Sequence, residues 1–418
     1  MENNITLSLK DFGPINEAKI DIGKITVVGG QNASGKSTSS KIFYSFLKFI
    51  SIDDAENYFY RTISDSFNEL VRYLDQIGLI PNDKNNIFYQ NIHNSDDLNL
   101  FFEEFNYYKE IYYSLDLPDG EEYIDNWISK IDFIIKPLYE NTDNIYNSLL
   151  RLFFVEEFLT NNFDGVAKLY GTHKKSDFNF FIDFSDSNLN FEDSFESKGG
   201  FPVHEVLYLD SCSIFDITQK GISHIHHIEN LMSNFRKSSD ESFDIFDERI
   251  NKPIINIENK INEIIGGEFR YEDNTLTFMP KSTVPCRLSN TASGIKQIGR
   301  IQLLLAQRKL KEKSCLIFDE PEVNLHPEWQ VKLAGILALI SSSLDVLIYI
   351  NTHSPIFIEA IEAFSEFYGL SDETNYYLTE LQDKGKYNFN KIEPDDLYLI
   401  YDNLGKPYDY IDEIKKKP

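Results

Sequence analysis

The chain has 418 residues, which is enough for two or three domains with well-buried cores. Aromatic residues are abundant, with 33 Phe and 24 Tyr, and this excludes a disordered chain. The formal net charge of −27 argues against a protein that binds nucleic acid over its whole surface, because such a surface repels phosphate; a local basic groove stays open as an alternative.

The first predicted element is a strand that leads through a glycine-rich loop into a helix. Residues 27–38 read "VVGGQNASGKST", and residues 30–37 have the spacing G-x-x-x-x-G-K-S of a phosphate-binding P-loop. The apolar "KITVVGG" predicts the strand, and apolar residues at helical spacing after Ser37 predict the helix. This context favours a nucleoside triphosphate site over a glycine turn that matches by chance.

The residue types in the loop suit that chemistry. Gly30 and Gly35 let backbone N–H groups approach phosphate oxygens, and the start of the helix adds partial positive charge. Lys36 would reach the β- and γ-phosphates, and Ser37 would hold Mg²⁺ through its hydroxyl group. We therefore expect ATP and Mg²⁺ as the cofactors.

Residues 51–200 differ in composition from the rest of the chain. They contain 29 acidic and 11 basic side chains, about two thirds of the net negative charge. About 283 residues separate Lys36 from Asp319, more than a P-loop domain needs, so we predict an inserted domain. Prolines and many Asn and Asp residues predict short helices rather than a coiled coil, and the aromatic residues of 100–115 predict the packed face of a helix.

Two features of residues 201–265 carry little weight. The stretch "EVLYLDSCSIFDITQ" predicts a strand and offers Gln219 as a Q-loop residue, but no distinctive spacing supports that role. The stretch "HIHHIEN" at 224–230 could bind a metal. Because no regularly spaced ligand set accompanies it, we favour a solvated element.

The carboxyl half contains an apolar strand with an acidic end. The stretch "KSCLIFDEPEVNLHPEWQ" opens with an apolar strand that ends in Asp319 and Glu320. Such a strand beside a P-loop predicts a Walker B element, in which Asp319 orients Mg²⁺ through its water shell and Glu320 polarises the attacking water. An ordinary strand with an acidic turn is the alternative, but the continuation "DEPEVNLHP" disfavours it.

Two further stretches place polar residues directly before a helix. The stretch "RLSNTASGIKQIGRIQLLL" predicts a polar turn that leads into an apolar helix. The stretch "VLIYINTHSPIFIEAI" predicts a buried strand with Asn351, Thr352 and His353 at its tip and a helix that starts with proline. Polar strand tips of this kind lie at the carboxyl edge of a parallel sheet, where nucleotides bind. Near the end, "NYYLTEL" predicts a last strand and "DLYLIYDNLGKP" a helix that stops at its glycine.

The ordered set of P-loop, "TASGIKQ", "LIFDEPEVNLHP" and "INTHSP" resembles the ABC-type ATPases of the RecF, SMC and OLD group. Within this group it is most similar to the small OLD-like, AAA-labelled ATPases of prokaryotic defence and repair systems. The resemblance covers residues 1–50 and 265–365, including the hairpin "GEFRYEDNTLTFMP" before the signature. It implies an α/β fold: a P-loop ABC-type ATPase head, with a mixed β-sheet flanked by helices and a large, mainly helical insertion.

The resemblance also implies roles for individual residues. Glu320, His353 and Lys36 would be catalytic, with His353 as the switch histidine that contacts the γ-phosphate. Ser37 and Asp319 would hold the metal. Residues 324–326 would form the D-loop. The nucleotide would be bound by Gly30, Asn32, Ala33, Ser34, Gly35, Lys36, Ser37 and Thr38 of one subunit and by Ser293 and Gly294 of a second subunit.

This last assignment implies a dimer that closes around ATP. A helix N-terminus is an anion site, and the helix behind Ser293 has no phosphate of its own. The signature departs from the family at Ala292, where serine is usual, and at Ile295, where Glu or Gln is usual. The loss of these polar groups bears on hydrolysis, unless Ser293 substitutes for the missing hydroxyl.

The expected organisation divides the head by the insertion. The head occupies residues 1–50 and 266–365, and residues 201–265 return to the head and form connecting helices. The acidic helical insertion occupies residues 51–200, and a strand and a helix occupy residues 366–418. We do not expect the Toprim nuclease domain that OLD nucleases carry, because it would not fit in the 65 residues after His353. The N-terminus "MENNITLSLKDFGP" does not resemble a signal peptide, residues 333–350 are interrupted by "SSSLD", and the three cysteines are scattered. We therefore expect a cytoplasmic protein without a membrane span.

Three functions remain open from the sequence. The first is an ATPase that forms a homodimer or higher homo-oligomer and gates a separate effector, a nuclease or toxin, in anti-phage defence. The second is a RecF-like repair ATPase that acts directly on DNA, which would require a local basic groove because the overall charge does not indicate nucleic acid. The third is the nucleotide-binding subunit of a transporter, which the large insertion disfavours. The first is the function we expect.

Overall fold

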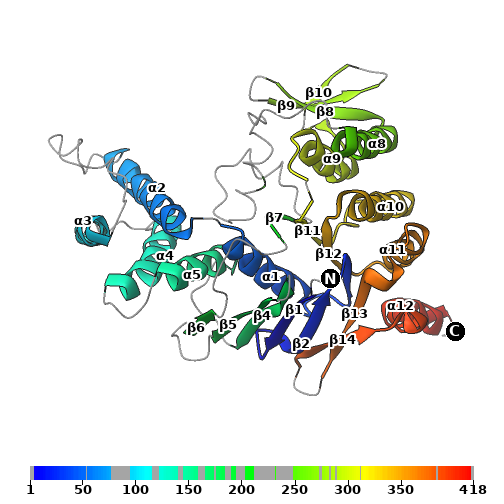
Figure 1. Ribbon diagram of the computed structural model, residues 1–418, viewed down its shortest axis with the longest axis horizontal. Helices are drawn as coiled ribbons and strands as arrows, with labels where there is room; N and C mark the ends of the chain where they lie inside the picture. Colours follow the sequence, from blue (N-terminus) through cyan, green and yellow to red (C-terminus); the bar gives the residue numbers. More distant parts are fainter. Residues whose placement is uncertain are drawn as a thin grey trace.

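The computed structural model describes most of the chain and places its strands in one large and one small sheet (Figure 1). The described residues are 4–52, 54–76, 95–114, 122–139, 145–158, 165–173, 176–183, 190–193, 203–210, 231, 248–272, 275–281, 284–287, 290–310, 312–382 and 385–415.

The large sheet is mixed, and its parallel part carries the candidate site. The five strands at one end of the sheet run parallel to one another, whereas the five strands at the other end pair antiparallel. In spatial order the described strands are β6 (Asn190–Asp193), β5 (Ser176–Asp183), β4 (Val166–His173), β1 (Asn4–Lys10), β2 (Ile15–Ile22), β14 (Tyr387–Ile392), β13 (Thr374–Leu381), β3 (Ile25–Gly29), β12 (Leu347–Thr352), β11 (Ser314–Asp319) and β7 (Glu205–Leu209).

The central strands are buried on both faces because consecutive side chains point to opposite sides of the sheet. Val28 of β3 packs in one hydrophobic core and Val27 in the other. Helix α1 (Lys36–Ile50) packs against the first face, and α10 (Pro327–Leu344) with α11 (Pro355–Phe367) covers the second (Figure 1). This explains the continuous apolar runs that predicted these strands.

The small sheet forms a separate lobe with two helices. Its strands are β8 (Gly267–Glu272), β9 (Thr275–Pro280) and β10 (Cys286–Arg287), and β8 pairs with β9 as the hairpin that the sequence predicted. Helices α8 (Glu248–Ile265) and α9 (Ser293–Ala306) pack on each other beside this sheet, and α8 contacts α10 (Figure 1). The signature helix therefore lies in the lobe and the P-loop in the large sheet.

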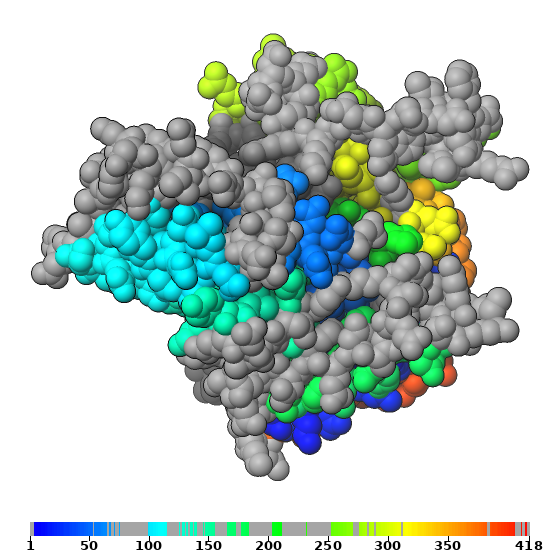
Figure 2. Space-filling model, turned by 60° about the vertical axis from the view of Figure 1, so that its left-hand side comes forward, coloured from blue at the N-terminus to red at the C-terminus, as the bar shows by residue number. Residues whose placement is uncertain are grey.

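Helices dominate the first part of the acidic region. They are α2 (Ala55–Gln76), α3 (Ser95–Tyr113), α4 (Glu122–Tyr139) and α5 (Ile145–Phe158), and they project to one side of the sheet (Figure 1). Figure 2 shows α3, in cyan, on the surface of that side. The aromatic stripe of α3 is packed as predicted, since Phe101, Phe105, Tyr108 and Tyr112 are buried.

The structure differs from the expected helical segment 51–200 after Phe158. Strand β4 pairs along its length with β1, so residues 166–193 extend the main sheet. The reason lies in alternation: Ala167 and Leu169 are buried and Lys168 is exposed, which suits a strand at a half-buried sheet. The α/β class with a mixed sheet flanked by helices, which the sequence predicted, is the observed one.

The last helix corrects a second prediction. Helix α12 (Tyr398–Lys415) continues past Gly405 for ten more residues, so the glycine stop was wrong. A glycine in a helix costs only about 1 kcal/mol relative to alanine, and a Cβ at this position would meet nothing within 4 Å, so no close packing requires glycine there. None of the described helices is both long and apolar enough to cross a membrane.

Candidate functional site

The loop between β3 and α1 has the backbone of a phosphate-binding loop. Gly35 precedes α1 with a φ angle of 94°, and Ala33 also has positive φ, at 61°. A Cβ on Gly30 would collide with Thr379 Oγ1 of β13, so a larger residue does not fit there. No side chain caps the first N–H groups of α1, which leaves them available to an anion.

The Lys36 side chain lies against this loop. Its Nζ donates hydrogen bonds to the carbonyl oxygens of Gly30, at 3.0 Å, and Gln31, at 2.7 Å. Burial lowers the pKa of Lys36, whereas the negative charges of Glu320, Asp319 and Glu322 act in the opposite direction. The ammonium group therefore stands between the loop and three carboxylates.

The remaining predicted P-loop residues lie around the start of α1. Asn32 and Ser37 are exposed, and Thr38 is partly exposed. Ser34 is buried, and its Oγ has no hydrogen-bond partner in the described part of the chain. Ser37 is thus open to solvent at the position where the sequence places a metal ligand.

Two hydroxyl groups fix α1 to the sheet. Ser39 Oγ lies 3.0 Å from the Tyr349 hydroxyl group of β12, and Ser40 Oγ lies 2.9 Å from the Tyr208 hydroxyl group of β7. Both serines are fully buried. The position of the P-loop helix therefore depends on side chains from two strands.

The Walker B strand meets this helix through Asn351. Asp319 of β11 and Asn351 of β12 are register partners, and Asn351 Nδ2 donates to Asp319 Oδ1 at 2.9 Å. The same Nδ2 donates to Ser40 Oγ at 2.8 Å. Asn351 Oδ1 is buried and has no partner among the described residues. Asn351 therefore ties the candidate metal ligand to α1.

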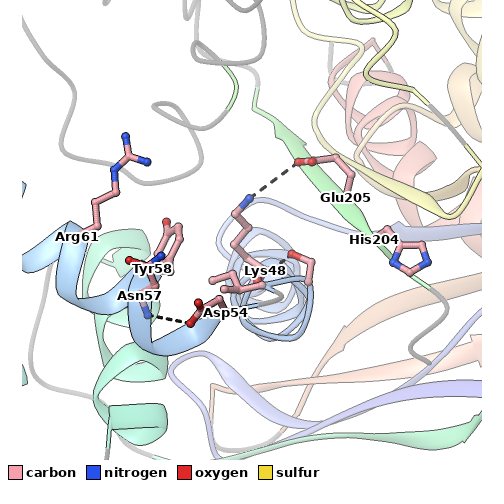
Figure 3. Close-up of a pocket in the computed structure, with 9 residues that line it drawn as sticks. Lys48, Asp54, Asn57, Tyr58, Arg61, His204 and Glu205 are labelled. Atoms are coloured by element: carbon pink, nitrogen blue, oxygen red, sulfur yellow. Dashed lines mark hydrogen bonds and ion pairs between the residues drawn. The ribbon is translucent and has the colours of Figure 1, made fainter. Parts of the chain in front are cut away.

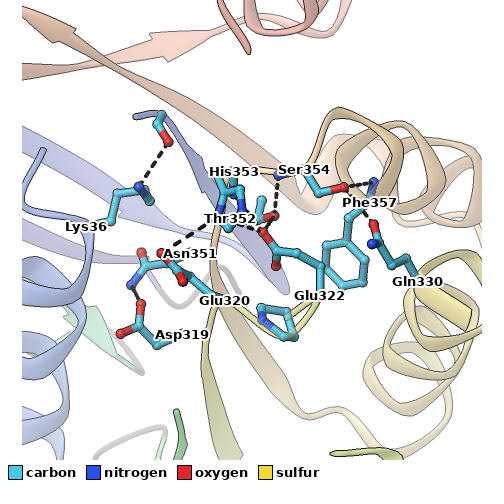
Figure 4. A network of polar contacts seen from close by, with 12 residues as sticks. Lys36, Asp319, Glu320, Glu322, Gln330, Asn351, Thr352, His353, Ser354 and Phe357 are labelled. Atoms are coloured by element: carbon cyan, nitrogen blue, oxygen red, sulfur yellow. Dashed lines mark hydrogen bonds and ion pairs between the residues drawn. The ribbon is translucent and has the colours of Figure 1, made fainter. Parts of the chain in front are cut away.

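Glu320 and His353 lie at the ends of adjacent strands. Glu320 has a φ of 53°, and its backbone N–H donates to the Asn351 carbonyl oxygen at 2.9 Å. Its Oε1 lies 3.7 Å from His353 Nδ1. Figure 4 shows these side chains with Lys36 and Asp319 at the carboxyl end of the parallel strands. The four residues that the sequence placed at the reaction centre therefore come together.

A second glutamate lies at the same place. Glu322 Oε1 accepts hydrogen bonds from Thr352 Oγ1 at 2.6 Å and from the His353 backbone N–H at 2.8 Å (Figure 4). Burial raises the pKa of Glu322, although the hydrogen bonds from Thr352 and His353 favour its charged form. Sequence reasoning gave no role to this residue.

The signature residues lie beside a different loop. Helix α9 begins after Ala292 without a side-chain cap, and Ser293 is exposed. A Cβ on Gly294 would lie 3.2 Å from Leu325 Cδ2 and 3.4 Å from the Asn324 carbonyl oxygen. The tip of the signature helix is thus packed on the turn that the sequence identified as the D-loop.

That turn leads directly into α10. Asn324 is exposed and has a φ of 65°, and Leu325 is buried. His326 is the N-cap of α10, and its Nδ1 accepts a hydrogen bond from the Glu328 backbone N–H at 3.4 Å. From α9, Gln297 Nε2 donates to the Pro321 carbonyl oxygen at 3.3 Å, which connects the signature helix to the Walker B turn.

The structure adds Glu322, Asn351, Thr352 and Ser40 to the polar network. The sequence placed Asn351 and Thr352 at a polar strand tip, because an apolar strand precedes them. It did not predict which residues they contact. Glu322 is one of three acidic residues in "DEPE", and the sequence did not distinguish a buried carboxylate from an exposed one.

Two sequence predictions lie outside the described residues: Gln219 and the histidine stretch at 224–230. Within the described ranges, no group of three or more His, Cys, Asp or Glu side chains is placed to hold a metal ion. A Mg²⁺ site of one carboxylate, one hydroxyl group, phosphates and waters does not need such a group.

A pocket lies at the opposite end of α1 from the P-loop. It has a volume of about 370 Å³ and is lined by the end of α1, the start of α2 and the start of β7. Figure 3 shows Lys48 directed towards Glu205, with 3.9 Å between Nζ and Oε1. None of the predicted site residues lines this pocket.

Residues 5–358 match a family model described as an AAA ATPase domain. A search of curated proteins finds no match.

Solved structures with some similarity include three SMC heads. The SMC head domain from Thermotoga maritima is 12% identical, with a TM-score of 0.41 over 94% of this chain and 100% of that chain. An Smc head bound to the C-winged helix domain of ScpA is 11% identical, with a TM-score of 0.41 over 94% and 98%. An Smc head with an extended coiled coil, bound to the C-terminal domain of ScpA derived from Pyrococcus furiosus, is 12% identical, with a TM-score of 0.34 over 99% and 100%.

Proposed function

The chain belongs to the AAA ATPase domain family and is therefore a nucleotide-binding P-loop ATPase, and from this premise we propose that two copies close around ATP and hydrolyse it. We further propose that the nucleotide state of this dimer gates a separate effector protein, in anti-phage defence. The position of the signature helix supports the dimer. Within one chain the tip of this helix, at Gly294, packs on residues 324–325, whereas Lys36 packs on the P-loop.

The residues around the P-loop suit a nucleotide with Mg²⁺. Asp319 has one oxygen held by Asn351, Ser37 is exposed at the start of α1, and Asn351 Oδ1 is buried without a partner among the described residues. Mg²⁺ prefers such oxygen ligands and keeps several waters. Ser37 and Asp319 would hold the ion, which would neutralise charge on the β- and γ-phosphates.

Lys36 and Glu320 supply the remaining charges. Lys36 is buried beside the loop, so its ammonium group can bind phosphate oxygens with little competition from water. Glu320 stands just beyond the strand end, where a carboxylate can take a proton from a water that attacks the γ-phosphate. His353, on the neighbouring strand, would contact the same phosphate.

The second half of the site would come from a second copy. Ser293 is exposed, and the uncapped start of α9 presents N–H groups that suit an anion. An isologous dimer brings the same surface of both copies together, so each α9 tip could meet the P-loop of the other copy. Hydrolysis would then require two chains.

Mixing two inactive variants tests this arrangement. Lys36→Ala removes the P-loop charge, and Ser293→Asp adds a carboxylate that repels phosphate while suiting the start of a helix. If sites form between copies, each variant alone is inactive, and an equal mixture regains about a quarter of wild-type turnover because half of the dimers contain one intact site. An inactive mixture, or an active Ser293→Asp variant, would contradict the proposal.

A binding experiment tests whether the protein has a separate effector. The acidic segment 51–200, whose helices α2–α5 project from the sheet, supports a protein partner rather than DNA, because acidic surfaces repel phosphate backbones. The Glu320→Gln variant should hold ATP and keep the effector bound, so a pull-down from the native host should recover a second protein. Recovery of DNA with no second protein would favour the repair function instead.

A further inference from the structure

The Glu322 side chain is buried directly behind the candidate switch histidine, with 3% of its surface exposed. One of its oxygens, Oε1, accepts the hydrogen bonds from Thr352 Oγ1 and from the His353 backbone N–H. The same oxygen lies 3.3 Å from His353 Nδ1. A single carboxylate oxygen therefore contacts the residue before the histidine, the backbone of the histidine and its ring.

Two carboxylates compete for this ring nitrogen. The distance from His353 Nδ1 is 3.3 Å to Glu322 Oε1 and 3.7 Å to Glu320 Oε1. The first is close to the range of N–H···O hydrogen bonds and the second lies beyond it. Glu322 is also the more buried of the two side chains, at 3% exposure against 28%, so water weakens its interaction less.

We propose that Glu322 is a positioning residue that keeps the proton of the His353 ring on Nδ1 and so leaves Nε2 as the nitrogen that faces the nucleotide. This inference rests on the proposed function, in which His353 contacts the γ-phosphate of ATP. The hydrogen bond made by one ring nitrogen determines which nitrogen carries the proton, and carboxylates commonly fix histidines in this way. Glu320 is then left free of the ring and can act on water.

The second oxygen of Glu322 supports a role for its charge. Oε2 is buried and has no hydrogen-bond partner among the described residues. A carboxylate that only anchored the β12 tip could be replaced by a neutral amide, which would avoid the cost of a buried charge. A buried charge in contact with a histidine at the mouth of a nucleotide site is the pattern of a functional group.

The first test reads the histidine directly. Nitrogen NMR of histidine side chains, without nucleotide, distinguishes a proton on Nδ1 from one on Nε2, and the His353→Asn variant identifies the signal of His353. The Glu322→Gln variant keeps an acceptor oxygen for Thr352 and the His353 backbone but removes the charge. We expect the proton on Nδ1 in the wild type and a shift towards Nε2 in Glu322→Gln.

A matched control is available on the surface. Glu328 is exposed and pairs with Lys332 at 2.6 Å, so Glu328→Gln makes the same chemical change away from the ring. It should leave the His353 signal unchanged, and Glu322→Asp, which keeps the charge on a shorter side chain, should restore part of the Nδ1 form. A proton on Nε2 in the wild type, or an unchanged signal in Glu322→Gln, would overturn the inference.

The second test separates this inference from the proposed function. We expect Glu322→Gln to lower kcat by about 10- to 100-fold with little change in KM for ATP, as is common for residues that orient a reacting group. A wild-type protein without ATPase activity would contradict the proposed function but would leave the NMR test intact. An active wild type with an equally active Glu322→Gln variant would contradict the inference alone.

Discussion

The two helix tips that could bind phosphate, at α1 and at α9, are built in different ways. The α1 tip is enclosed: Lys36 is buried, and Ser39 and Ser40 hold the helix to two strands, β12 through Tyr349 and Asn351 and β7 through Tyr208. The α9 tip is open, because Ser293 and the preceding Ala292 are exposed. Both helices start without a side-chain cap.

The difference indicates separate roles for the α1 and α9 tips. The α1 tip is held in place by side chains that are far apart in the sequence. Such preorganisation suits a site that binds the charge of a phosphate group. The α9 tip touches residues 324–325 of its own chain, and its first residue, Ser293, is exposed. Changes at α1 should therefore affect folding and chemistry together, and changes at α9 should affect chemistry alone.

Glu320→Gln should produce the largest effect on chemistry. The amide cannot accept a proton from water, so we expect the hydrolysis rate to fall by about 100- to 10,000-fold while ATP still binds. Phosphate release measures the rate, and light scattering with ATP measures the mass of the trapped complex. A variant that hydrolyses ATP at the wild-type rate would remove Glu320 from the reaction centre, and a trapped complex with the mass of one chain would remove α9 from it.

Gly30→Ala tests how tightly the α1 tip is enclosed. The added methyl group would collide with Thr379 Oγ1, and such overpacking costs about 1–3 kcal/mol in the free energy of unfolding. Thr379 Oγ1 is buried without a partner among the described residues, so Thr379→Ala should relieve part of the strain. Denaturant unfolding of the two single variants and the double variant measures this. Purely additive effects would contradict the predicted collision.

Asn351→Ala and Ser293→Ala form a pair that compares the two tips directly. Loss of Asn351 removes the donor to Asp319 Oδ1 and one of the hydrogen bonds of Ser40 Oγ, which should cost about 1–3 kcal/mol. Loss of the exposed Ser293 hydroxyl group should change stability by no more than about 0.5 kcal/mol. Asn351→Ala should also raise the Mg²⁺ concentration needed for hydrolysis, by about 10- to 100-fold. Equal unfolding energies for the two variants would break the comparison.

Much of the fold and the centre of the site follow from local patterns. The P-loop, the acidic end of β11 and the polar tip of β12 are each encoded within a few residues, and the parallel sheet brings them together. The partners that hold them are not local: Ser40 and Asn351 are 311 residues apart, and Ser40 and Tyr208 are 168 apart. Nothing in the sequence near Ser40 indicates either contact.

The missed features have specific causes. The pairing of β4 with β1 depends on a register between residues more than 150 apart, which composition cannot reveal. Helix α12 passes Gly405 because the cost of one glycine is small. Glu322 differs from Glu320 in burial, and its buried carboxylate contacts Thr352 and His353, which lie 30 and 31 residues away in the sequence and outside the motif itself.

The smallest expected effect is on the pH dependence of stability, and Glu322 should carry it. Burial raises the pKa of Glu322 above its ordinary value of 4.5, in a site that also contains Lys36 and His353. A raised pKa means that the folded state prefers the protonated carboxyl group, so its stabilisation is full below pH 4.5 and is lost as the pH rises through the folded-state pKa. Glu322→Gln has no charge to bury, so its Tm relative to wild type should increase from pH 4.5 towards neutral pH.

The control should move the other way. The ion pair with Lys332 lowers the pKa of Glu328, so this exposed carboxylate contributes its stability above its ordinary pKa and loses it as the pH falls. The Tm of Glu328→Gln relative to wild type should therefore decrease slightly towards neutral pH. If the Tm of Glu322→Gln relative to wild type also decreased towards neutral pH, the Glu322 carboxylate would stabilise the fold as a surface ion pair does. The enclosed side of the site near α1 would then contain no buried charge that destabilises the fold.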